Sequence, residues 1–368
     1  ILTRNQTVQI GDSGRTAMEN FDFYENSLIG AYKNVKIPEI AQILWFTHAG
    51  DLSDVHYDIF TKNPEAIQDE IRQTVEERGE YDFDRSLQLC EYGFAILRDG
   101  TYHAADGVQP GVNTQRDMWL YHGNALRHGH LSTLNLGMEA FGLNIAPDFG
   151  YPEFCDGSDA MLNWNHSTIS HNTVMVNEVH QNRVTRAGTP LHFDDAGQVK
   201  LMDIDAPDAY GDTSIFRRSV MMIRVNDEIS YGVDFFRVKG GRDHLYSFHA
   251  LSDEIAETEN LTFVEQTMGS YAGPNIAWGT PGSTSGYSWL YHVRRADDPR
   301  TGSFAVDFKI RDFRKTLPTD RNIHLRVSML NPFDVDEVSL AKGKPPQVKR
   351  NPEEIEFMLV RRRGADLD

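Results

Sequence analysis

The chain has 368 residues, of which 40% are hydrophobic and 24% charged, and its formal net charge at pH 7 is −18. This length and composition indicate a globular protein with room for two domains. The acidic charge argues against non-specific nucleic-acid binding, and no apolar run reaches the roughly 18 residues of a membrane-spanning helix. A local basic cleft would still let such a protein bind a polyanion, so net charge does not exclude an acidic polysaccharide.

The cysteines and the beginning of the chain give two further expectations. Cys90 and Cys155 are the two cysteines, and they form neither a disulfide framework nor a CxxC metal site. We interpret both as buried or half-buried thiols. The chain starts at Ile1 without an initiator Met, a basic n-region or an apolar signal core. The opening reads as sequence from the middle of a protein, and we expect an upstream segment.

The first part of the chain, up to about residue 90, has the pattern of helices. Residues 38–48 carry an apolar stripe with helical spacing. The clearest helix is predicted for residues 64–78. Asn63 before it is a suitable N-cap, Pro64 suits the first helical position, and Gly79 is typical of a helix end.

After about residue 90 the pattern changes to short strands separated by Gly, Asn, Asp and Pro. Strands are predicted at residues 92–97, 118–122, 173–176, 219–225, 230–237, 245–250, 288–294, 303–310 and 324–329. Helices followed by strands predict an α+β fold, with a helical domain at 1–90 and an antiparallel β-sandwich at 91–368.

Segment 123–182 holds the densest set of chemically active side chains. In an extended stretch His128 and His130 would share a face, and the same parity would place His130 beside Leu134 at the edge of a core. A buried imidazole needs a partner, either a backbone carbonyl or a metal ion. His130, Asp148 and His171 have the ligand types that zinc takes. The chain has 14 histidines, so spacing alone leaves both alternatives open.

Several ordered blocks resemble the heparinase II/III-like family of polysaccharide lyases, most closely its exolytic alginate-lyase and exo-heparinase branch. The strongest blocks are His128–Leu131, Ala140–Gly142, Asp148–Tyr151, Ser167–Val176 and Gln181. Further agreement comes from Ile10–Ser13, Tyr231–Asp234, Phe236–Val238, His244, Phe248–His249 and His324–Val327.

The resemblance implies a fold and a reaction. The fold would be the C-terminal part of an incomplete (α/α) toroid followed by an antiparallel β-sandwich. The reaction would be β-elimination on uronic-acid polysaccharides, exolytic, with alginate or heparin/heparan-type substrates. Family members use a Tyr and a His as base and acid. That Tyr would precede Ile10 and lie upstream of Ile1, in a toroid part outside this chain, so activity would require that part.

The resemblance also implies roles for individual residues. His128 is the expected catalytic residue, in carboxylate neutralisation or proton transfer. His130, Asp148 and His171 match positions that hold zinc in some members, where the metal has a structural role. Arg127, Tyr151 and Arg183 are the expected substrate-binding residues. Trp164 is either a sugar-stacking platform or a partly buried aromatic, and Asn172 and Gln181 are expected to hold loops.

Two other functions were weighed against the lyase. The first is a non-catalytic carbohydrate-binding β-sandwich, which gains weight if the toroid part is absent. The second is a zinc-dependent hydrolase, which loses weight because no glutamate stands in an H-E-x-x-H-like arrangement. The expected partner is an acidic polysaccharide or oligosaccharide, with neither nucleic acid nor membrane, and the expected location is the periplasm.

Overall fold

The computed structural model describes residues 2–3, 6–8, 10–12, 25–56, 59–100, 102–103, 112–126, 128–150, 159–226, 229–282, 285–299, 302–313, 315, 317, 319, 321–330, 335–345, 352–365 and 367–368. The chain forms two compact units, Ile1–Val8 with Met18–Phe83 and Gln9–Ala17 with Asp84–Asp368. Among the described helices, none has the length and apolar character needed to cross a membrane. Cys90 is exposed with a free thiol, so its interpretation as a buried thiol was wrong; Cys155 lies outside the described residues.

In its described residues, the first unit contains three α-helices and a short hairpin. The helices are α1 (Glu25–Val35), α2 (Pro38–Thr47) and α3 (Pro64–Arg78), and strand β1 (Leu2–Thr3) pairs with β2 (Gln6–Thr7). Helices α2 and α3 confirm the two predicted helices. Asn63 is the N-cap residue of α3, although its side chain makes no capping hydrogen bond. One apolar core holds this unit together, formed by Ile29, Tyr32, Ala41, Leu44, Leu52, Val55, Ile67 and Ile71.

The second unit is built from antiparallel sheets. The five-stranded sheet runs, in spatial order, β3 (Leu87–Leu89), β4 (Phe94–Asp99), β7 (Arg116–Tyr121), β8 (Asn135–Ala140) and β9 (Leu143–Ala146). The four-stranded sheet runs β11 (Thr189–Asp194), β12 (Val199–Asp205), β13 (Thr213–Arg224) and β14 (Ser230–Gly240).

The remaining sheets complete this unit. The six-stranded sheet runs β10 (Val174–Val176), β15 (Asp243–His249), β22 (Ile355–Arg363), β21 (Glu337–Gly343), β18 (Tyr291–Ala296) and β17 (Phe263–Glu265). The three-stranded sheet runs β16 (Ile255–Glu259), β19 (Phe304–Ile310) and β20 (Ile323–Met329), and β5 (Tyr102–His103) pairs with β6 (Val112–Asn113). Every pairing between these strands is antiparallel, and each predicted strand overlaps an observed one.

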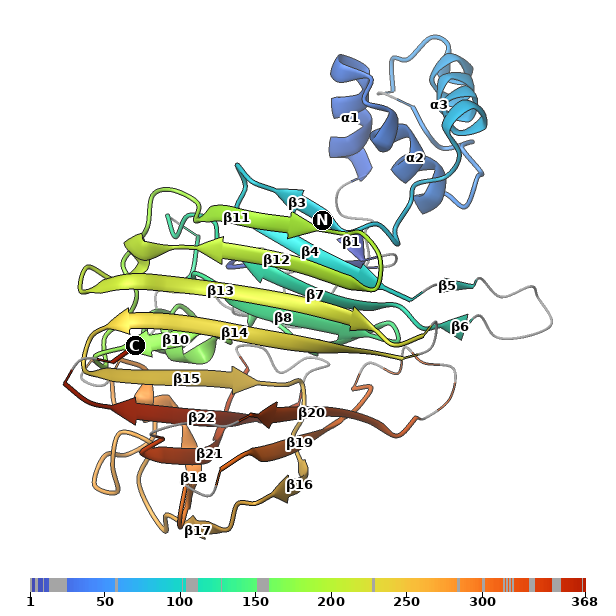
Figure 1. Cartoon of the computed structure of the whole chain (residues 1–368). Coiled ribbons are helices and arrows are strands. Elements are labelled where there is room, and N and C mark those ends of the chain that lie inside the picture. The colour runs from blue at the N-terminus through green and yellow to red at the C-terminus, as the bar shows by residue number, and fades with distance from the viewer. Residues whose placement is uncertain are drawn as a thin grey trace. The chain divides into compact units, whose positions relative to one another are not determined.

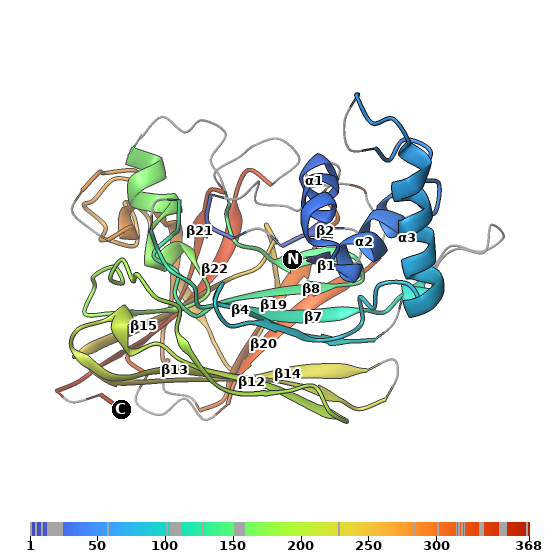
Figure 2. The same ribbon diagram turned by 90° about the horizontal axis from the view of Figure 1, so that it is seen from above.

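The sheets of the second unit pack face to face as layers, with strands β11–β14 in front of β4, β7 and β8 (Figures 1 and 2). Strand β13 shows how the sequence produces this packing. Its alternate residues Phe216, Arg218, Val220 and Met222 are buried, whereas the residues between them are partly exposed, as expected of a strand covered on one face. The buried face contacts Leu97, Leu120 and other apolar residues of the five-stranded sheet in one core. The structure therefore confirms a mainly antiparallel sheet architecture for this part of the chain.

The tight turn between β8 and β9 directs the chain toward the candidate site. Phe141 and Gly142 both have positive φ, 57° and 81°, and Ala140 pairs with Leu143 across them. Two loop residues with positive φ are typical of a type I′ hairpin turn, whose twist matches the flanking strands. The Ala140–Gly142 block therefore has a structural explanation, because it sets the hairpin after which Asp148 follows.

Candidate metal centre and its histidine cluster

Three loops of the second unit carry the candidate site. One loop, residues 128–134, precedes β8, and another, residues 147–150, follows β9. The third runs from the π-helix Met161–Asn165 through the 3-10 helix Thr168–Ser170 to β10. A turn at Gly11–Asp12 also belongs to this unit.

The structure brings His130, Asp148 and His171 together, and we call these three residues the histidine–aspartate centre. Nδ1 of His130 lies 3.0 Å from Nε2 of His171. Oδ1 of Asp148 lies 3.6 Å from His130 Nδ1, and Oδ2 lies 3.6 Å from His171 Nε2. All three side chains are fully buried. Three donor atoms of types that zinc accepts thus face one another inside the protein.

The hydrogen bonds behind these imidazoles determine which nitrogens face the centre as lone pairs. Nδ1 of His171 lies 2.7 Å from the carbonyl oxygen of Ser167, and Nε2 of His130 lies 3.2 Å from Oδ1 of Asp12. A carbonyl or a carboxylate can only accept, so we assign the imidazole protons to these two nitrogens. His130 Nδ1 and His171 Nε2 are then two lone pairs 3.0 Å apart, facing a carboxylate.

This donor set fits a tetrahedral zinc ion. Zinc–nitrogen distances of about 2.05 Å place neighbouring ligand atoms about 3.3 Å apart, and the observed separations of 3.0 and 3.6 Å lie on either side of that value. Burial lowers the pKa of His171 to about 4 and also lowers that of His130, although the hydrogen bond that His130 donates to Asp12 opposes the shift at His130. Both imidazoles therefore stay neutral at pH 7, as metal ligands must.

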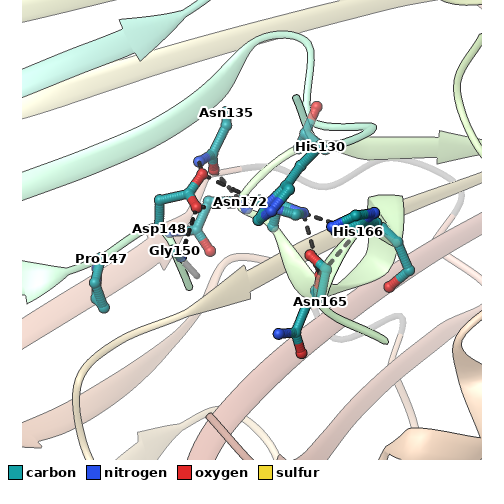
Figure 3. Close-up of polar contacts among 12 residues, drawn as sticks. His130, Asn135, Pro147, Asp148, Gly150, Asn165, His166 and Asn172 are labelled. Carbon is teal, nitrogen blue, oxygen red and sulfur yellow. Dashed lines mark hydrogen bonds and ion pairs between the residues drawn. The ribbon is translucent and has the colours of Figure 1, made fainter. Parts of the chain in front are cut away.

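Asp148 is held in place by two hydrogen bonds from the surrounding loops. Nδ2 of Asn135 donates to Oδ2 over 3.0 Å, and the backbone N–H of Gly150 donates to Oδ1 over 3.0 Å (Figure 3). Burial raises the pKa of Asp148, and the nearby His130 and these two bonds oppose that shift without cancelling it. Burial makes the charged form of this carboxylate unfavourable, which is why its pKa is raised. A cation beside the carboxylate would stabilise that charged form.

Asp12 joins a second group of imidazoles, and we call Asp12, His128, His130 and His166 the Asp12 cluster. Oδ1 of Asp12 lies 3.2 Å from His130 Nε2 and 3.3 Å from His166 Nε2, and Oδ2 lies 3.2 Å from His128 Nδ1. Burial alone would raise the pKa of Asp12, but the hydrogen bonds from His130 and His166 outweigh it and hold this pKa well below its usual value. The carboxylate is therefore ionised, with only 1% of its side chain exposed.

His128, the expected catalytic residue, lies at the surface of this cluster. Its side chain is 74% exposed, whereas that of His130 is completely buried. The expectation that the two imidazoles share one face of a strand was wrong. Residues 128–134 do not form a strand, and Leu134 has a left-handed φ of 62° just before β8 begins. The two histidines are connected because both bond the Asp12 carboxylate, and not because they lie on one face of a strand.

The expected substrate-binding residues are placed only in part. Arg127 and Tyr151 lie outside the described residues. Arg183 is exposed, and its Nη1 donates to the carbonyl oxygen of Ala125 over 3.0 Å. The backbone N–H of Ala125 in turn donates to Val184 over 2.9 Å. Arg183 therefore borders the loop that leads to His128.

The aromatic and amide side chains of the same segment have structural positions. Trp164 is 2% exposed and its indole N–H donates to the carbonyl of Lys344, so it is a core residue and not a sugar-stacking platform. Asn172 holds loops as expected, because Nδ2 donates to the carbonyls of Leu136 and His249 and Oδ1 accepts from the N–H of His249. Gln181 likewise accepts from the N–H of Thr133 and donates to its carbonyl.

Sequence reasoning missed two members of the Asp12 cluster. Asp12 lies in the Ile10–Ser13 block that contributed to the family resemblance, but no role was attached to it. His166 stands five residues before His171 in the densest segment, just outside the Ser167–Val176 block. In the sequence, Asp12 is recognisable only as part of a Gly–Asp turn. A turn motif does not predict a contact with His128, which lies 116 positions away.

Comparisons with known proteins show a family and a similar fold. Residues 87–328 match the family described as "Heparinase II/III-like, C-terminal". Two solved structures of the heparan sulfate lyase HepC from Pedobacter heparinus, a mutant and the unmodified protein, superpose with TM-scores of 0.52 and 0.51 at 13% and 14% identity. They cover 100% and 99% of this chain, and the chain spans 43% of the length of each. No curated protein sequence matches the chain.

Proposed function

Since the chain belongs to the heparinase II/III-like C-terminal domain family, we propose that it is the C-terminal part of a polysaccharide lyase. Its substrates are uronic-acid-containing polysaccharides or oligosaccharides, cleaved by β-elimination. The observation that carries this proposal is the exposed imidazole of His128, held by the buried Asp12 carboxylate beside the histidine–aspartate centre. This arrangement places the His128 imidazole at the surface, and the buried Asp12 carboxylate holds it there.

The proposed reaction breaks a C–O bond without water. The base removes the C5 proton of the uronate, and the electron pair of the C5–H bond forms the C4–C5 double bond. The C4–O bond breaks as this double bond forms, and its oxygen leaves with the bonding electrons and takes up a proton. The C5 proton is weakly acidic beside a charged carboxylate, so the enzyme must neutralise that carboxylate and supply both a base and an acid.

In this proposal His128 neutralises the substrate carboxylate or transfers a proton, and Arg183, with Arg127 and Tyr151, contacts the sugar. His130, Asp148 and His171 hold a structural zinc ion, which would join the loops before β8 and β10 to the loop after β9. When bound, the zinc supplies positive charge that offsets the buried Asp148 carboxylate. The chain's own residues then keep His128 in a fixed position at the surface.

The proposal extends to the rest of the protein. Helices α1, α2 and α3 form the C-terminal part of an incomplete (α/α) toroid, and the catalytic tyrosine comes from a toroid part outside this chain. The substrate is of alginate or heparin/heparan type, the action is exolytic, and the location is periplasmic. The superposing structures are those of a heparan sulfate lyase, which supports a glycosaminoglycan substrate.

The second candidate is a non-catalytic carbohydrate-binding β-sandwich. It is favoured by the position of Tyr32, which is 3% exposed in the helical core and so is not placed to act as a base. Tyr24 and Tyr57 lie outside the described residues. In this alternative the same surface binds an acidic sugar without cleaving it.

Ultraviolet absorbance of the unsaturated uronate product separates the two candidates. The chain is incubated separately with alginate, heparan sulfate, heparin and hyaluronan, and then again with the upstream sequence restored. The lyase is supported by an absorbance increase that disappears in His128→Ala but persists in His324→Ala. His324 is the control because it also bonds a carboxylate, that of Asp307, but lies on the three-stranded sheet. The lyase proposal fails if all four polymers bind and none gives a rise with either form of the protein.

A further inference from the structure

We infer that Asp12 is a positioning residue that serves both His128 and the histidine–aspartate centre. This inference rests on the proposed function, because it concerns how the proposed catalytic and metal-binding residues are held. In this inference, the Asp12 carboxylate determines which imidazole nitrogen carries the proton in His128 and in His130. The other nitrogen of each ring is then the one that binds the metal or meets the substrate.

The position of Asp12 is built into the backbone as well as the side chain. Its N–H donates to the carbonyl oxygen of His128 over 2.9 Å. The preceding Gly11 has a φ of 57°, and a Cβ at that position would lie 2.7 Å from the same carbonyl oxygen. Only glycine permits so close an approach in this conformation. The turn therefore packs directly on the His128 backbone and directs the carboxylate toward the imidazoles.

For His130, the Asp12 carboxylate decides the tautomer. A neutral imidazole has one N–H donor and one acceptor nitrogen. Asp12 Oδ1 lies 3.2 Å from Nε2 and can only accept, so the proton resides on Nε2 and the Nδ1 lone pair faces His171 and Asp148. In the other tautomer a proton on Nδ1 would occupy the space between the imidazoles and prevent metal binding. Carboxylates that orient metal-binding histidines in this way are common.

For His128, the same carboxylate decides which atom faces outward. Oδ2 of Asp12 lies 3.2 Å from Nδ1 of an imidazole that is 74% exposed. A bond at Nδ1 restricts this surface side chain and places the lone pair on Nε2. His128 would therefore meet the substrate through Nε2, and its orientation would depend on Asp12.

A purely structural role for Asp12 predicts different behaviour. A buried carboxylate that merely stabilises the loops would lower the midpoint of unfolding when it is replaced, with no selective effect on metal affinity or on tautomers. Asp307, which bonds Nδ1 of His324 over 2.6 Å and is mostly buried, provides the matched comparison. Replacing Asp307 removes a histidine–carboxylate bond of the same kind on a different sheet.

The first test measures zinc affinity by competition with a chelator, using the full chain. Asp12→Asn is expected to bind zinc about 10- to 100-fold more weakly than the unsubstituted chain. Asp307→Asn and His128→Ala should both stay within about threefold, since neither removes the bond to His130 Nε2. An Asp12→Asn variant that folds and binds zinc within about threefold of the unsubstituted chain would overturn the inference.

The second test needs neither zinc nor a folded variant. Imidazole nitrogen NMR of the unsubstituted, metal-free chain should show His130 protonated at Nε2 and His128 protonated at Nδ1. Finding His130 protonated at Nδ1 instead would refute the role of Asp12. If the unsubstituted chain binds no zinc, the proposed metal centre fails, and the NMR result then decides on Asp12 separately.

Discussion

Asn135 donates a hydrogen bond of 3.0 Å from Nδ2 to Oδ2 of Asp148, so the first residue of β8 fixes the carboxylate that follows β9. The oxygen of the same amide accepts from the backbone N–H of Asn172, next to His171, over 2.9 Å. One side chain therefore connects the loops that bring two of the three centre residues together. Precise placement of metal ligands depends on such supporting contacts.

Replacing Asn135 should weaken metal binding without removing a ligand. Asn135→Ala is expected to lower zinc affinity roughly 10- to 100-fold, because Asp148 loses one of its two hydrogen-bond donors and the His171 loop loses an acceptor. The control is Asn144→Ala, which removes another buried asparagine in the neighbouring strand β9. Equal affinities for the two variants, measured by competitive zinc titration, would contradict the supporting role of Asn135.

Acid should destabilise the fold through buried histidines, most clearly through His249. Its ring packs against Phe149 and Phe357, with centroids 4.8 and 4.9 Å away, and burial lowers its pKa to about 3. The unfolded chain, with a histidine pKa of about 6.5, binds the proton first as pH falls. This residue's contribution to stability is therefore complete above about pH 6.5 and is lost progressively toward about pH 3.

The size of this effect can be measured by urea unfolding in the presence of chelator. Between pH 6.5 and pH 5, His249 alone should remove about 2 kcal/mol from the free energy of unfolding. His249→Gln lacks that contribution, so its stability should fall less steeply than that of the unsubstituted chain. Parallel slopes for the two proteins would show that burial does not lower the pKa of His249 in the fold.

Removing Arg218 should be strongly destabilising. Its guanidinium is fully buried, bonds both oxygens of Asp234, and donates to the carbonyls of Leu134 and Asn172 over 2.6 and 2.5 Å. Arg218→Leu leaves these acceptors unsatisfied and should cost about 3–5 kcal/mol. Arg217→Leu removes a more exposed pair with Asp203 on the other face of β13 and should cost at most about 1 kcal/mol. Similar losses for both arginines in denaturant unfolding would refute this interpretation.

A single methyl group at Gly137 should disturb the five-stranded sheet. A Cβ at this position would lie 1.9 Å from the indole ring of Trp119, which pairs with Gly137 across β7 and β8 and is 1% exposed. The ring cannot move far in a packed interior, so Gly137→Ala should cost about 1–3 kcal/mol. Gly211→Ala, where a Cβ meets nothing within 4 Å, is the matched control. Equal thermal midpoints for the two variants would show that the sheet accommodates the methyl group.

Local patterns were sufficient for much of the fold and less so for the site. Helix α3 could be predicted because Pro64 at its first position and Gly79 after its last are local signals. The convergence of His130, Asp148 and His171 was expected through the family resemblance, since spacing alone did not favour it over ordinary hydrogen bonds. The parity argument for His128 and His130 was wrong because it required a strand where the chain makes a turn at Leu134. Contacts over long sequence separations, such as Asp12 with His166, leave no periodic signal.

The way Asp12 reaches the histidines has a practical consequence for dividing this protein into fragments. A piece cut at the limits of the family match, 87–328, would lack Asp12 as well as strands β21 and β22. Those two strands lie in the middle of the six-stranded sheet, between β15 and β18. Such a fragment would expose two strand edges and leave His128 and His130 without their shared carboxylate. The range matched by sequence similarity is therefore too short to serve as a fragment that keeps both the six-stranded sheet and the site.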